Sequence, residues 1–252
     1  LRPAKLVTIE REGVELHGAL LEPRHVDPHV RYPVLVYVYG GPGVQQVLDR
    51  WSPRLFWQHL ADRGVVVFQL DNRGSSGRGR AFEAPIAGRL GEVELGDQLA
   101  GLDELAKLPF CDVSRAAIYG HSYGGFMAAL AMLKAPGKFR VGVAGSPVTD
   151  WRLYDTGYTE RYMGTPASNP AGYAASDLAG SAKHLAGRLL LVHALMDENV
   201  HFANTAHLVE ALIEAGKPVD TFVFPGERHG YRSNAARAYA PEHVAQYLVE
   251  HL

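Results

Sequence analysis

Six short apolar runs recur along the chain, and none of them alternates with polar residues. They cover residues 34–39, 65–68, 116–119, 141–144, 189–192 and 221–224. Unbroken runs rich in β-branched and aromatic residues are typical of strands that are covered on both faces, as in a parallel sheet. We therefore predict six central strands in one mostly parallel sheet.

The segments between these runs have the spacing of apolar residues that is typical of helices. They lie near residues 54–62, 93–107, 123–134, 202–215 and 236–251. Strands that alternate with helices predict an α/β fold with right-handed crossovers and helices on both faces of the sheet. We expect one α/β domain over residues 1–252.

Two further segments extend this pattern. Residues 5–22 resemble two short strands around a turn at Glu12-Gly13. Residues 150–183 are rich in Tyr, Gly, Ala and Pro, and we expect short helices and loops there, over the edge of the sheet.

Composition narrows the class of protein. Hydrophobic residues make up 47% of the 252 residues, which is enough for a sizeable core. The formal net charge of -2 argues against nucleic acid or an anionic membrane as a partner. A single cysteine, Cys111, excludes an intrachain disulfide and a cysteine-based zinc site, and we expect no metal and no cofactor.

The ends of the chain and its apolar runs bear on its origin. No run approaches the roughly 20 residues that span a bilayer. The chain begins at Leu1 rather than Met, so we expect it to be part of a longer or processed protein. Its compartment stays open, with the cytoplasm and the bacterial periplasm as the alternatives.

A nucleophile motif stands between a predicted strand and a predicted helix. The stretch Gly120-His121-Ser122-Tyr123-Gly124 follows the run 116–119 and precedes helical spacing. In a G-x-S-x-G elbow, a tight turn lifts the serine hydroxyl clear of the sheet, and the flanking glycines avoid a collision there. Ser122 is therefore the predicted nucleophile of a hydrolase.

A serine hydroxyl needs a base and an orienting acid. In an α/β fold with such an elbow, the acid and then the histidine should follow the serine along the chain. Asp197 follows the run 189–192, with Glu198 as the competing carboxylate, and His229 follows the run 221–224. We expect the remaining histidines to serve the core or the surface, including His121, which the elbow should hold away from the triad.

The negative oxygen of an acyl-transfer intermediate needs two hydrogen-bond donors. One is the backbone N–H of Tyr123, directly after the nucleophile. The second should come from the loop Tyr39–Gly43, whose glycines allow a close backbone approach. Either a backbone N–H or the Tyr39 hydroxyl could donate.

Five stretches together resemble a known family. They are residues 37–42, 71–75, 120–126, 155–163 and 197–202. They are similar to the catalytic α/β-hydrolase domain of the prolyl oligopeptidase family of serine peptidases, in its dipeptidyl peptidase IV branch. The resemblance runs from about Tyr32 to the C-terminus. The stretches YTERYM and DENVHF are the most specific, and they are closest to the cytosolic eight-and-nine type and to bacterial relatives.

The resemblance implies a peptidase that forms an acyl-enzyme and releases N-terminal dipeptides with proline, or less well alanine, in second place. It makes Ser122, Asp197 and His229 the catalytic triad. It also makes the Tyr39 hydroxyl the second oxyanion donor, beside the Tyr123 N–H. Asn199 would bind the substrate carbonyl that precedes the proline. The implied proline pocket is lined by Tyr123, Val148, Trp151, Tyr154, Tyr158 and Val200.

The chain also departs from the family. His121 stands where most members have Trp, and Ala194 follows His193 where Gly is common. The family's N-terminal β-propeller, which covers the site and supplies two glutamates for the substrate amine, has no counterpart among these residues. We expect that propeller as a partner domain in the full-length protein, and the resemblance also suggests a homodimer.

Two other functions compete with a peptidase. A free-standing esterase or thioesterase would use the same triad. A non-catalytic interaction module would show a broken triad, whereas all three triad residue types are present here.

Overall fold

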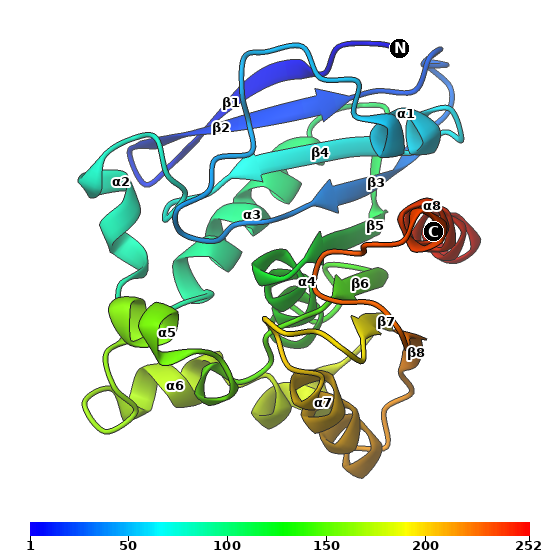
Figure 1. Ribbon diagram of the computed structural model, residues 1–252. Coiled ribbons are helices and arrows are strands. Elements are labelled where there is room, and N and C mark those ends of the chain that lie inside the picture. Colours follow the sequence, from blue (N-terminus) through cyan, green and yellow to red (C-terminus); the bar gives the residue numbers. More distant parts are fainter.

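The computed structural model describes residues 1–252 and contains one eight-stranded sheet (Figure 1). The strand order is β1-β2-β4-β3-β5-β6-β7-β8. The strands are β1 (Lys5–Arg11), β2 (Val14–Leu21), β3 (Tyr32–Tyr37), β4 (Val66–Asp71), β5 (Cys111–His121), β6 (Val141–Gly145), β7 (Arg188–Ala194) and β8 (Asp220–Phe224).

The six strands from β3 to β8 are parallel, and they correspond to the six apolar runs. The first two strands form the predicted hairpin, which joins the sheet antiparallel to β4. Glu12 and Gly13 both have positive φ, 53° and 75°, as a two-residue turn of this kind requires.

Five helices match the helical spacing of the sequence. They are α1 (Leu55–Ala61), α3 (Glu92–Leu105), α4 (Tyr123–Lys134), α7 (Ala203–Glu214) and α8 (Asn234–His251). The irregular segment holds the predicted short helices, which are η2 (Trp151–Leu153), α5 (Thr156–Met163), α6 (Pro170–Ser176) and η3 (Ala179–His184). The sequence did not predict the short turns α2 (Arg80–Glu83) and η1 (Ala84–Ile86).

The bounds of all six central strands differ by one or more residues from the apolar runs, and β3 and β5 show where the differences arise. β3 ends at Tyr37; Val38 N still donates to Tyr119 O at 2.8 Å, but Tyr39 already belongs to the loop. β5 begins at Cys111, and the register between β3 and β5 shifts at Pro33/Val34, where proline offers no N–H to the ladder.

Helices cover both faces of the sheet, and each face has its own core. α1 and α8 cover one face, where Leu35 and Val67 pack. α3, α4 and α7 cover the other, where Val36 and Phe68 pack. Figure 1 shows α8 and α1 together on one side of the sheet and α3 and α4 on the opposite side. No helix combines the length and apolar character needed to cross a membrane.

Candidate active site

Ser122 occupies a strained turn between β5 and α4. Its φ of 62° and ψ of -119° lie where a side chain is normally disfavoured. A Cβ at Gly120 or at Gly124 would collide with the Val38 carbonyl oxygen, so both positions require glycine. The Ser122 N–H donates to Gly145 O at 2.8 Å, which ties the turn to β6.

The three predicted triad residues lie in one hydrogen-bonded row. His229 Nε2 is 3.0 Å from Ser122 Oγ, and His229 Nδ1 is 2.9 Å from Asp197 Oδ2. They come from the loops after β5, β7 and β8, at the carboxyl edge of the parallel strands. With the proton on Nδ1, the imidazole is ready to accept the Ser122 proton at Nε2.

Asp197 is the carboxylate of this row, and the competing Glu198 is not. Burial raises the pKa of Asp197, but hydrogen bonds from His193, from His229 and from the Val200 N–H outweigh it and hold the pKa far below its usual range. Glu198 is half-exposed, and its Oε2 accepts only the His229 backbone N–H, at 3.3 Å.

Two histidines support the row in a way the sequence analysis did not anticipate. His193 is fully buried; its Nδ1 bonds Thr205 Oγ1 at 2.7 Å, and its Nε2 bonds Val200 O at 2.8 Å and also lies 3.4 Å from Asp197 Oδ2. We expected the elbow to hold His121 away from the triad, but its ring lies 4.9 Å from that of His229.

His121 Nε2 is 3.0 Å from His229 O. Burial lowers the pKa of His121 to about 4, so the neutral ring donates this hydrogen bond at ordinary pH. The contact arises because Tyr119 and His121 point to the sheet face over which the loop of His229 returns.

One predicted oxyanion donor follows the nucleophile directly in the chain, and the other belongs to a residue whose ring lies near that of Tyr123. Tyr123 is the first residue of α4, where backbone N–H groups have no partner within the helix. The ring of Tyr39 lies 6.1 Å from the ring of Tyr123. Burial raises the pKa of Tyr39, so its hydroxyl keeps its proton and can donate it to a hydrogen bond.

The predicted proline pocket is an aromatic cluster around Trp151. The Trp151 ring lies 5.5 Å from Tyr123, 5.8 Å from Tyr154 and 6.0 Å from Tyr158, on which it stacks. Val148 and Val200 are buried in the same core. Tyr162, 4.9 Å from Tyr158, extends the cluster and was not predicted.

Asn199 is oriented by this cluster. The Tyr154 hydroxyl donates to Asn199 Oδ1 at 2.8 Å. The amide NH2 of Asn199 therefore remains as the donor side of the group.

The buried carboxyl group of Glu94 contacts the cluster, and no sequence pattern predicted it. The Tyr123 hydroxyl donates to Glu94 Oε1 at 2.6 Å, Glu94 is fully buried, and its Oε2 has no hydrogen-bond partner. Burial raises the pKa of Glu94 to about 7, against the opposing hydrogen bond from Tyr123.

One group of side chains has the composition of a metal site. Asp150, Asp177 and His207 place their ligand atoms within 4.8 Å of one another. The guanidinium of Arg152 lies 2.7 Å from Asp150 and 2.8 Å from Asp177. Arg152 therefore supplies the positive charge, and the group clamps the turn that carries Trp151.

A serine on a strand-to-helix elbow, followed by an acid and a histidine after later strands of a mostly parallel sheet, defines an α/β-hydrolase fold. The sequence profile of the prolyl oligopeptidase family matches residues 51–252. The chain belongs to this family of serine-type peptidases, as its motifs predicted.

Named relatives agree with the dipeptidyl peptidase branch. Human dipeptidyl peptidase 8 is 42% identical over 246 residues, which are 95% of this chain and 27% of the human protein. The crystal structure of Porphyromonas gingivalis dipeptidyl peptidase 4 superposes with a TM-score of 0.95 at 37% identity, covering 99% of this chain and 36% of that one. A Bacteroides ovatus structure gives a TM-score of 0.96 at 39% identity, with the same coverage of 99% and 36%.

Proposed function

We propose that this chain is the catalytic domain of a serine peptidase that releases N-terminal dipeptides with proline, or less well alanine, in second place. The observation that carries the proposal is the hydrogen-bonded row Asp197–His229–Ser122, with the aromatic cluster around Trp151 on neighbouring segments. The family membership and the dipeptidyl peptidase relatives support it.

The chemistry follows from the positions of these groups. Ser122 Oγ attacks the substrate carbonyl while His229 Nε2 takes its proton, and Asp197 stabilises the charged imidazole. The Tyr123 N–H and the Tyr39 hydroxyl bind the oxyanion. His229 then protonates the leaving amine, and a water molecule hydrolyses the acyl-enzyme by the same route.

The pocket suits a proline ring. A flat pyrrolidine against the rings of Trp151, Tyr154 and Tyr158 gains roughly 1.5–3 kcal/mol from apolar burial. Because Tyr154 holds the oxygen of Asn199, the Asn199 amide can donate to the carbonyl that precedes the proline.

Selection of a free N-terminus requires groups outside these residues. The chain spans 27% of the length of human dipeptidyl peptidase 8 and 36% of the Porphyromonas enzyme. This difference in length supports the expectation of a further domain, for which we propose a β-propeller that supplies acidic groups for the substrate amine.

The test uses the full-length protein and Gly-Pro-anilide. We expect Ser122→Ala to lower hydrolysis by on the order of 10⁶ while the circular dichroism spectrum stays unchanged. Ser114→Ala, at the other end of β5 and exposed, is the matched control and should keep full activity.

Near-normal turnover by the Ser122→Ala protein would disprove the mechanism. Hydrolysis of short acyl esters by the wild-type protein, without any release of anilide from Gly-Pro-anilide, would indicate an esterase instead.

A further inference from the structure

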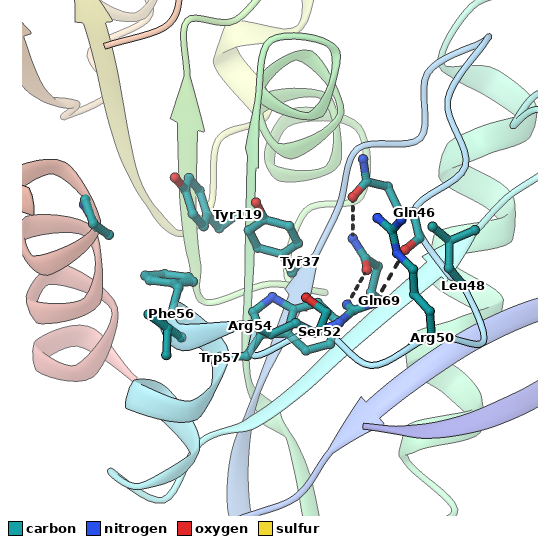
Figure 2. Close-up of a pocket in the computed structure, with 12 residues that line it drawn as sticks. Tyr37, Gln46, Leu48, Arg50, Ser52, Arg54, Phe56, Trp57, Gln69 and Tyr119 are labelled. Atoms are coloured by element: carbon teal, nitrogen blue, oxygen red, sulfur yellow. Dashed lines mark hydrogen bonds between the residues drawn. The ribbon is translucent and has the colours of Figure 1, made fainter. Parts of the chain in front are cut away.

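A cavity of about 370 Å³ lies on the sheet face that α1 and α8 cover (Figure 2). One wall is aromatic and consists of Tyr37, Phe56, Trp57 and Tyr119. The other wall is polar and consists of Gln46, Arg50, Ser52, Arg54 and Gln69. An aromatic wall opposite cationic groups suits a small ligand that is apolar at one end and anionic at the other.

The two arginines of this cavity have no acidic partner. No carboxylate oxygen lies within 4.0 Å of Arg50 or Arg54, whereas about half of the arginines of the chain have such a partner. Desolvation lowers the pKa of Arg54, the charges of Tyr37 and Asp71 oppose this shift, and the positive charge of Arg50 adds to it. Asp71, the acid of this region, is occupied by the backbone N–H groups of Gln46 and Val47.

Hydrogen bonds and a ring contact fix the orientation of the Arg54 guanidinium, and some of its N–H donors remain available. It donates to Gln69 Oε1 at 2.8 Å and to Gln46 O at 3.4 Å, and its guanidinium lies 4.1 Å from the centre of the Trp57 ring. A guanidinium has five N–H donors, so those that remain can bind a carboxylate, the planar anion that arginine recognises best.

The cavity lies on the same sheet face as the ring of His121, which contacts His229. Tyr119 lies on β5 and precedes Ser122, in the turn that follows this strand, by three residues, or about 10 Å at roughly 3.3 Å per residue. Tyr119 shares its sheet face with His121, whose ring lies against His229. Trp151 and the proline pocket belong to the core of the opposite face. Since His229 protonates the leaving amine, we infer that the released segment departs on this face, toward the cavity.

We propose that this cavity binds the C-terminal residue of the released peptide segment, with its carboxylate on Arg50 and Arg54 and its side chain against the aromatic wall. The proposal rests on the proposed peptidase function and adds a substrate class to it. A segment of about three residues spans the distance from Ser122. Pentapeptides with a free C-terminus and an apolar last residue are therefore the preferred substrates.

The experiment compares Gly-Pro-Ala-Ala-Phe with its C-terminal amide on the full-length protein, with Gly-Pro-anilide as the reference. We expect kcat/KM to be about tenfold higher for the acid, through KM, because only the acid makes charge-assisted hydrogen bonds. Arg50→Ala should remove this preference and leave the amide and the anilide unchanged. Arg140→Ala, an exposed arginine just before β6, should keep the preference.

A second measurement avoids turnover. Calorimetric titration of the Ser122→Ala protein with Ala-Ala-Phe and with its amide should show about tenfold tighter binding of the acid. Phenylpropanoate serves as the free small acid in the same titration and, as an inhibitor, in the pentapeptide assay.

The outcomes separate the two proposals. Equal kcat/KM for acid and amide, with Gly-Pro-anilide cleaved, overturns the cavity proposal and leaves the peptidase intact. Without anilide cleavage the peptidase proposal fails, and the titration alone decides on the cavity: equal binding of acid and amide overturns it. If phenylpropanoate binds but the peptide acid has no advantage over its amide, the cavity serves a free acid, and the assignment to the released segment is wrong.

Discussion

Replacement of Glu94 by Gln isolates the effect of one buried charge. The carboxyl group is fully buried, Oε1 accepts the Tyr123 hydroxyl at 2.6 Å, and Oε2 has no partner. Gln keeps the shape and the acceptor for Tyr123 and stays neutral at every pH. Its NH2 group lacks a partner, which costs about 1–3 kcal/mol independently of pH.

The expected magnitude follows from the pKa of Glu94, which burial raises from 4.5 to about 7. Between these values the folded protein holds a proton that the unfolded chain has released, so stability falls as the pH rises. The difference between the two pKa values corresponds to about 3 kcal/mol. This contribution is fully present below pH 4.5 and is lost as the pH passes through 7.

Urea unfolding of the 252-residue chain at pH 5, 6, 7 and 8 measures this effect. The free energy of unfolding of wild type minus that of Glu94→Gln should fall by about 2.5 kcal/mol over this range, because part of the contribution is already lost at pH 5. Glu92→Gln, which is exposed on the first turn of the same helix, should show no such change. A difference between wild type and Glu94→Gln that stays constant with pH would refute the reasoning.

The remaining predictions concern the site and its elbow. Asp197→Asn should lower kcat for Gly-Pro-anilide by roughly 10⁴, because the imidazole loses its orienting charge; stopped-time assays of the full-length protein measure it, and a loss under tenfold would contradict the role of Asp197. Tyr39→Phe should lower kcat by roughly 10²–10³ with little change in KM, and an unchanged kcat would assign the second oxyanion donor to a backbone N–H. Gly124→Ala should destabilise the fold by about 3 kcal/mol, because its Cβ would meet the Val38 carbonyl; an unchanged urea midpoint would show that the elbow can relax.

The predictable part of this protein is local in sequence. Each central strand was visible as an unbroken apolar run, and Ser122 was visible because an elbow needs its glycines next to it. Asp197 and His229 could be placed because parallel strands end at one edge, so that loops far apart in the chain meet there.

The part that escaped prediction depends on which distant side chains face each other. Glu94 is 29 residues from Tyr123 in the chain, and His121 is 108 residues from His229. No local pattern marks such a pair. The end of β3 was also misplaced, because Val38 and Tyr39 continue the apolar run although Tyr39 has already left the sheet.

The position of β8 at the edge of the sheet has a consequence for how the protein fails. β8 pairs with β7 alone, and the loop that follows it carries His229, whereas Ser122 follows β5, which has neighbours on both sides. Edge strands open with less free energy than central ones. Fraying of this one strand would remove the base while the nucleophile and most of the core stay in place, so the catalytic machinery is less robust than the fold that supports it.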